Sequence, residues 1–210
     1  MTNESIYPER PRPNRLPLLI FVATLGFAVI AGVAYQEASE ERDNPHSLLV
    51  TETDPDALNR IVEQRRLVLS GLSSSDDPVA FARASAQYGE ALTVRASLDG
   101  KTEDLPLALT AIDQALAGFE DGSIEAWLQS KGADTAASAQ HLRALVYFKR
   151  GEVFFAMGES AQDRTHFAAA AEAFGKAAMA FEFIGDPAFV AMAQRERTQS
   201  ENRLRTVAGD

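Results

Sequence analysis

The stretch GEVFFAMGESAQDRTHFAAAAEAFGKAAMAFE, residues 151–182, decides the fold class of this chain. Apolar residues recur at helical spacing before and after its polar middle, which predicts two antiparallel helices joined by a short turn. The same arrangement occurs 62 residues earlier in the chain. Identical residues that this shift brings into register are Gly89 with Gly151, Glu90 with Glu152, Ala108 with Ala170, Ala111 with Ala173, Ala115 with Ala177 and Phe119 with Phe181. The sequence therefore predicts two equivalent helix pairs.

Start and stop signals predict helices along the rest of the chain as well. Asp54-Pro55 and Asp77-Pro78 each place a capping carboxylate before a proline at the first helical position. Gly185-Asp186-Pro187 ends one helix and begins the last. The expected helices span about residues 54–71, 77–96, 105–119, 124–129, 134–157, 164–184 and 186–205. No window alternates apolar and polar residues between turns, so the predicted fold is all-α without a sheet.

The small residues of the two pairs resemble those of the tetratricopeptide repeat family. In that family the first helix of a pair carries a small residue, often glycine. The second carries Ala, then a bulky residue four positions later, then Ala three positions later. The matching positions here are Gly89, Ala108, Ile112 and Ala115 in the first pair, and Gly151, Ala170, Phe174 and Ala177 in the second. The resemblance implies that residues 54–210 form a tetratricopeptide-like antiparallel helical-repeat domain.

The chain also departs from the family pattern. Both pairs have a turn about seven residues longer than the family standard, and an extra block at about 123–143 separates the pairs. An irregular helical bundle is therefore the alternative interpretation.

The resemblance places a binding surface on the first helix of each pair, because that helix lines the concave face of tetratricopeptide domains. The positions implied are Arg83, Ala86, Glu90 and Thr93 in the first pair, and Leu145, Phe148, Glu152 and Phe155 in the second. Among them we expect Phe148, Glu152 and Phe155 to contact a protein partner, the phenylalanines through an apolar stripe. The alternative is that both phenylalanines belong to the core, where bulky apolar residues are commonly found.

An uncharged run of 21 residues, 16–36, predicts a membrane-spanning helix near the N-terminus. As a helix it would extend about 31 Å, which matches a hydrocarbon core of about 30 Å, whereas a signal peptide has an apolar region of about 7–15 residues. Small residues at 32–34 leave cleavage open as the alternative. Arginines precede the run and glutamates follow it. The positive-inside rule therefore predicts an inner-membrane protein with a cytoplasmic tail at 1–15, a connector at 37–53 and a periplasmic domain.

Three small residues of this predicted anchor, Thr24, Ala28 and Gly32, recur every four positions and would share one face of the helix. A row of small residues lets a second transmembrane helix approach closely, so we expect these three to take part in partner binding. The alternative is that glycine is simply frequent in membrane helices.

Composition and charge argue against several classes of function. The 210 residues carry a formal net charge of −10, and the chain after residue 15 has 17 basic and 28 acidic side chains. An acidic domain repels phosphate backbones, so no nucleic-acid partner is expected. The chain has no cysteine, and His46, His141 and His166 fall in different predicted elements, so neither a metal site nor a cofactor is expected. No phosphate-binding glycine loop or nucleophile motif is present, and we expect no enzyme and no small-molecule substrate.

These observations favour a non-enzymatic, membrane-anchored protein–protein interaction module. Its expected partners are subunits of a larger inner-membrane complex, which this single-pass protein would serve as a scaffold, an accessory subunit or an assembly subunit. The alternative is a periplasmic chaperone-like protein that accompanies the secretion channel, because the layout resembles that of bacterial inner-membrane proteins with such a role.

Overall fold

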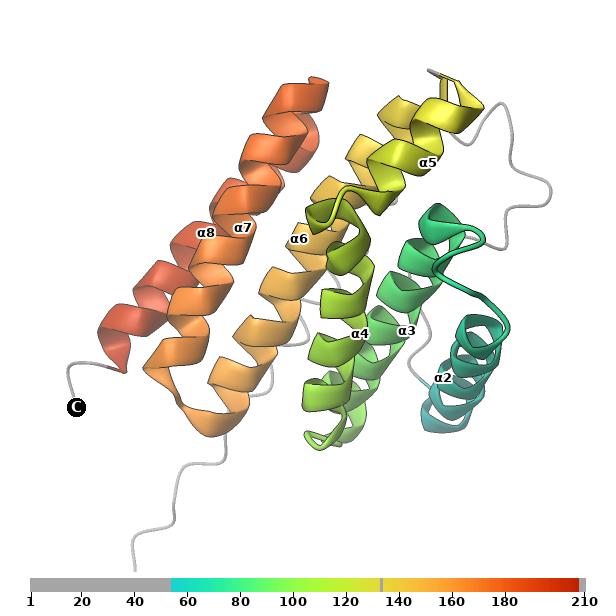
Figure 1. Cartoon of the computed structure of the whole chain (residues 1–210). Helices are drawn as coiled ribbons and strands as arrows, with labels where there is room; N and C mark the ends of the chain where they lie inside the picture. Colours follow the sequence, from blue (N-terminus) through green and yellow to red (C-terminus); the bar gives the residue numbers. More distant parts are fainter. Residues whose placement is uncertain (1–53, 133, 208–210) are drawn as a thin grey trace, which may run out of the picture. The chain divides into compact units, whose positions relative to one another are not determined.

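Every regular element in the part of the chain that the computed structural model describes, residues 54–132 and 134–207, is an α-helix. The seven helices are α2 (Pro55–Ser70), α3 (Pro78–Asp99), α4 (Asp104–Glu120), α5 (Ser123–Lys131), α6 (Asp134–Ala161), α7 (Arg164–Ile184) and α8 (Pro187–Thr206) (Figure 1). The all-α prediction is confirmed for these residues. None of the described helices is both long and apolar enough to cross a bilayer. The predicted tail at 1–15, anchor at 16–36 and connector at 37–53 lie outside the described residues.

Aspartates cap the helix starts that the sequence marks. Asp77 Oδ1 accepts a hydrogen bond of 2.9 Å from the backbone amide of Ala80 at the start of α3. Asp186 Oδ1 accepts a bond of 3.2 Å from the amide of Phe189 at the start of α8. Each carboxylate satisfies an amide that would otherwise have no partner in the first helical turn, which fixes where the helix begins.

The end of α6 differs from the prediction. The expected helix stops near Met157, whereas α6 continues to Ala161. Gly158 does not end the helix, because it lies against the following one: a Cβ added to it would be 2.8 Å from Phe167 Cε1. The chain turns instead at Gln162, whose φ of 52° lies in the left-handed region. This glycine serves packing between helices and not termination.

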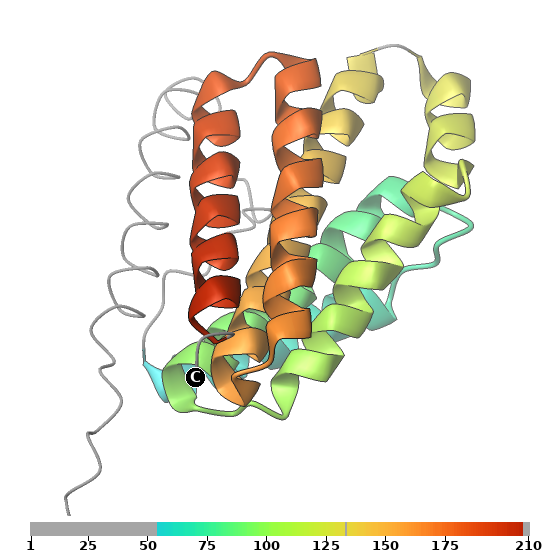
Figure 2. The same ribbon diagram turned by 90° about the vertical axis from the view of Figure 1, so that its left-hand side faces the viewer.

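The helices are arranged as antiparallel neighbours in the order α2, α3, α4, α6, α7 and α8, with the short α5 between α4 and α6 (Figures 1 and 2). The pairs α3–α4 and α6–α7 pack closely, while α2 packs on α3 and α8 on α7. In addition, α6 contacts both α3 and α4. It is therefore the helix that joins the two halves of the domain.

Glycine permits the close approach of the helices in both pairs. A Cβ added to Gly89 of α3 would lie 2.8 Å from Ile112 Cγ1 of α4, and one added to Gly151 of α6 would lie 2.7 Å from Phe174 Cδ1 of α7. Both distances are well below the roughly 3.5–4.0 Å of a favourable carbon–carbon contact. The alanines at the matching positions of the second helices are also buried. Small residues therefore let the two helices of each pair approach closely at these equivalent positions.

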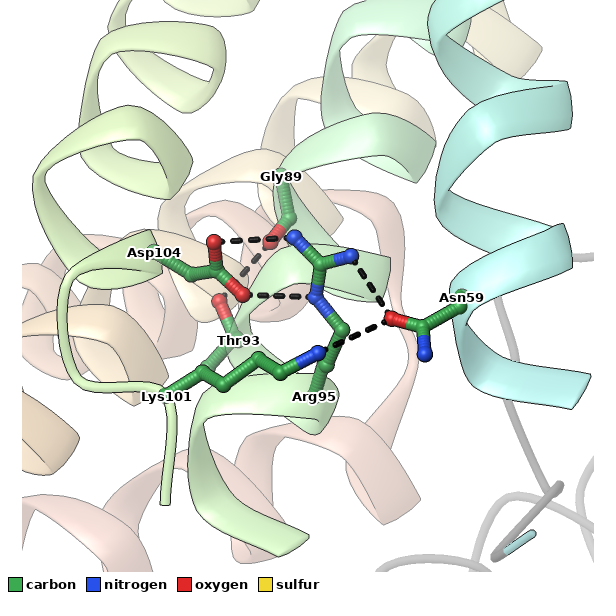
Figure 3. A network of polar contacts seen from close by, with 6 residues as sticks. All are labelled: Asn59, Gly89, Thr93, Arg95, Lys101 and Asp104. Atoms are coloured by element: carbon green, nitrogen blue, oxygen red, sulfur yellow. Dashed lines mark hydrogen bonds and ion pairs between the residues drawn. The ribbon is translucent and has the colours of Figure 1, made fainter. Parts of the chain in front are cut away.

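A polar network ties α2 to the turn between α3 and α4 (Figure 3). Arg95 binds Asp104 with two hydrogen bonds, from Nε at 2.7 Å and from Nη2 at 2.9 Å. Its remaining terminal nitrogen donates to Asn59 Oδ1 of α2 at 3.0 Å, and Lys101 Nζ donates to the same oxygen at 3.1 Å. Asp104 is buried, so its charge is stabilised mainly by this paired geometry.

Candidate functional site

The two phenylalanines expected on a partner-binding stripe of α6 lie in the core. Phe148 is 1% exposed and its ring centroid lies 5.1 Å from that of Phe174. Phe155 is 4% exposed and its ring centroid lies 5.5 Å from that of Phe167. Both pairs are edge-to-face contacts between α6 and α7. Both phenylalanines therefore belong to the core, which was the alternative to a partner-binding stripe, and they offer almost no surface to a partner.

Glu152, the third expected partner residue on α6, belongs to a buried ionic cluster. Lys149 Nζ lies 3.0 Å from Glu152 Oε2 on the same helix and 2.6 Å from Glu90 Oε1 on α3. Glu90 and Lys149 are both buried, and Glu152 is only slightly exposed. The cluster brings together Glu90 and Glu152, which the repeat alignment had made equivalent, and it links the two helix pairs through one ammonium group.

Burial and charge shift the ionisation of this cluster in opposite directions. Burial raises the pKa of Glu90 to about 7, although the neighbouring Lys149 charge lowers it; the Glu152 charge adds to the rise and Arg65 opposes it. Burial alone would lower the pKa of Lys149, but the charges of Glu152 and Glu90 outweigh burial and raise it. The lysine is therefore held as an ammonium ion, whereas burial favours the protonated form of Glu90.

A further buried carboxylate lies on α8. Glu196 is buried, and its Oε1 accepts a hydrogen bond of 2.9 Å from Arg195. Burial raises the pKa of Glu196, Arg195 lowers it, and the charge of Glu152 raises it further. Sequence reasoning missed this residue. Its position in the sequence could have indicated burial, because Glu196 follows Met192 by four residues and so falls on the apolar face of its helix.

The most exposed apolar residues lie elsewhere, on the outer face of α7. Phe183 is 82% exposed and Met179 is 63% exposed. An open hollow of about 500 Å³ lies at the turn from α7 into α8, and Glu182 and Asp186 are among the residues that line it. Sequence reasoning missed this surface too, because the alanine-rich pattern of α7 drew attention to its buried face. The four-residue spacing of Met179 and Phe183 could have indicated an apolar face, since it places both residues on the side of the helix opposite Ala177.

The remaining expected residues form no further site. Thr24, Ala28 and Gly32 lie outside the described residues. Within the described ranges, no group of three or more His, Asp or Glu side chains is arranged to hold a metal ion. His141 packs edge-on against the stacked rings of Phe181 and Phe189, with ring centroids 5.8 and 5.7 Å away, so its environment is that of a packed aromatic residue.

Comparisons with protein-family models, with curated proteins and with solved structures find no match for this chain. The functional argument therefore depends on the residues of the chain itself.

Proposed function

We propose that this chain is a membrane-anchored protein–protein interaction module, an accessory or assembly subunit of a larger inner-membrane complex. The observation that supports it most directly is the equivalence of the two helix pairs. Gly89 receives Ile112 and Gly151 receives Phe174 at positions 62 residues apart, as a tetratricopeptide-like repeat requires. Stacked helical repeats present extended surfaces to proteins. A domain of this kind is suited to holding a partner.

The predicted anchor supports the same proposal. The uncharged run at 16–36 would hold the domain at the periplasmic face of the membrane, next to integral subunits. Tethering raises the effective concentration of the domain near such subunits, so that weak contacts by the anchor and by the domain reinforce each other.

The interior charges also support a role without catalysis. Lys149 is paired with two carboxylates at 2.6 and 3.0 Å, and those charges raise its pKa. A lysine that acts as a base or nucleophile needs a lowered pKa. Among the described residues, this buried lysine therefore serves as a link between α3 and α6.

Purification of the full chain from its native membrane in mild detergent tests the proposal. We expect a defined set of membrane-complex subunits to be recovered at fixed stoichiometry. Recovery of many unrelated, newly exported chains instead would favour the chaperone-like alternative. Recovery of the chain alone, under conditions in which other membrane complexes stay intact, would contradict the proposal.

Two further experiments test the predicted topology and identify the segment that recognises the partner. A reporter that is active only outside the cytoplasm, fused after Asp210, should be active, and a reporter active only in the cytoplasm should not. Exchange of residues 16–36 for an unrelated apolar helix should preserve much of the partner recovery. Complete loss, with normal insertion and folding, would assign recognition to the face of Thr24, Ala28 and Gly32.

A further inference from the structure

Two neighbouring apolar side chains are exposed on α7. Phe183 and Met179 have the highest exposed fractions, 82% and 63%, among the large hydrophobic side chains of the described residues. They are four residues apart, so they share one face of the helix. A single exposed apolar residue needs no explanation, whereas an apolar cluster with a polar rim is typical of interaction surfaces.

A hollow lies at the turn from α7 to α8, and its lining begins at Glu182, the residue before Phe183 in the chain. Residues that line it include Glu182, Asp186, Pro187, Val190, Ala191 and Gln194. Glu182 connects the hollow to the exposed pair, because it lies next to Phe183 in the chain and one helical turn after Met179. We call Met179, Phe183 and this hollow the α7–α8 corner. It offers apolar surface and carboxylates side by side.

The charge of the corner is negative. Glu182 and Asp186 contribute carboxylates, and the residues lining the hollow include no basic side chain. Glu182 is exposed, and in the described part of the chain no ion pair engages its carboxylate. The neighbouring basic residues are already paired within their own helices: Lys176 with Glu172 at 2.8 Å, Arg195 with Glu196 at 2.9 Å and Arg197 with Glu201 at 3.0 Å.

We propose that the α7–α8 corner binds a basic amphipathic segment of the partner protein. An apolar residue of that segment packs on Phe183 and Met179, while an adjacent lysine or arginine reaches Glu182 and Asp186. The methylene stem of a long basic side chain suits the apolar part of the hollow, and its charged head pairs with the carboxylates. The inference rests on the proposed function, since it names the chemistry of the partner that the domain holds.

Charge argues against two other occupants. A second copy of the chain in a two-fold dimer would place the same patch on both sides of the interface and bring Glu182 close to its own equivalent. Such like-charge contacts disfavour association. An anionic membrane surface is likewise repelled by an acidic corner, because lipid recognition of this type depends on clustered lysine and arginine.

A photo-crosslinking amino acid at position 183 of the full chain, in the cells that naturally produce it, identifies the occupant. We expect the crosslinked peptide to come from a subunit that co-purifies with the unmodified chain, and to carry a Lys or Arg within about one helical turn of the crosslinked residue. A crosslink to a second copy, to lipid, or to a peptide without a basic residue would overturn the proposal. The same amino acid at position 107 on α4, where Leu107 is also exposed, serves as the control.

Matched substitutions then measure the contribution of the corner. Phe183→Ser and Glu182→Arg should each reduce recovery of that subunit about tenfold or more, as expected for a contact near the centre of an interface. Leu107→Ser and Glu120→Arg, which change exposed residues of α4, should leave recovery unchanged. Replacing the crosslinked Lys or Arg of the subunit by glutamate should restore its recovery with Glu182→Arg.

The two proposals fail in different ways. Normal recovery of the complex with Phe183→Ser and Glu182→Arg would overturn the assignment of the corner and leave the proposed function standing. Absence of any stable complex with the unmodified chain would overturn the proposed function, and the assignment of the corner with it.

Discussion

Replacing Glu90 by glutamine should make the stability of the domain less dependent on pH. Glu90 is 5% exposed, and burial raises its pKa from an ordinary 4.5 to about 7 in the folded chain. A carboxyl group with a raised pKa binds its proton more tightly in the folded state than in the unfolded one. Its contribution to stability is therefore largest below pH 4.5 and is lost as the pH rises through 7.

The size of the effect follows from the shift. One pKa unit corresponds to about 1.36 kcal/mol, so a rise from 4.5 to about 7 amounts to about 3 kcal/mol in total. Most of this is lost between pH 5 and pH 8, since the unfolded chain is already largely ionised at pH 5. Glutamine does not titrate, and Lys149 keeps Glu152 as its partner. The variant should therefore gain about 2 kcal/mol relative to the natural chain over this interval.

Urea unfolding of both full chains in mild detergent at pH 5 and pH 8, followed by helical circular dichroism and by fluorescence of the single tryptophan, Trp127, measures this difference. Other titrating groups are common to both chains, so subtraction isolates the cluster of Glu90, Glu152 and Lys149. Glu120→Gln, at an exposed site on α4, should show no such trend. An unchanged stability difference between pH 5 and pH 8, or a change in favour of the natural chain at pH 8, would refute the reasoning.

Three other predictions follow from the packing. Ala177→Leu should lower the free energy of unfolding by about 1–3 kcal/mol because the site is fully buried. Ala168→Leu, at an exposed site of the same helix, should change it little. Equal effects of the two substitutions would contradict close packing at Ala177. Asp104→Asn should weaken the two-bond contact with Arg95 and speed hydrogen exchange in α2, and unchanged exchange would show that α2 is held without this network. Burial lowers the pKa of His141 although Asp186 opposes it, so the stability that this group contributes is present above pH 6.5 and is lost as the pH falls below it. His141→Leu should reduce that loss in the same urea assay. An unaltered acid response would exclude this histidine as its source.

Local signals explain why α7 could be predicted closely from the sequence. Asp163 caps its first turn through a bond of 2.8 Å to the amide of Thr165, and Gly185 ends it with a φ of 77°. Both devices act within a few residues of the helix end, so a short window of sequence contains them. The glycine pattern was also readable, because Gly89 and Gly151 recur at a fixed offset and each accepts a bulky residue of the next helix.

The candidate surfaces could not be read in the same way, because they depend on how helices are rotated against each other. Phe148 and Phe155 could face a partner or α7, and only the tertiary packing decides that they contact α7. Lys149 is charged, and a charged residue in a helix is commonly solvated. Its burial requires α3 to lie against α6, a contact between residues 59 positions apart in the chain. No local periodicity contains that information.

The position of α6 explains why the sequence does not reveal the neighbours of this helix, and what role the ionic cluster has. Val146 and Val153 of this helix belong to the core shared with α2–α5, while Phe148 pairs with an aromatic ring of α7. A helix between two cores is apolar on more than one side, so its sequence has no single face that identifies its neighbours. The consecutive residues Lys149 and Arg150 then join it to the first pair, through Glu90 of α3 at 2.6 Å and Asp113 of α4 at 2.8 Å. Aromatic packing therefore fixes α6 to α7, whereas charge contributes to its junction with α3 and α4, and the raised pKa of Glu90 makes that junction sensitive to pH.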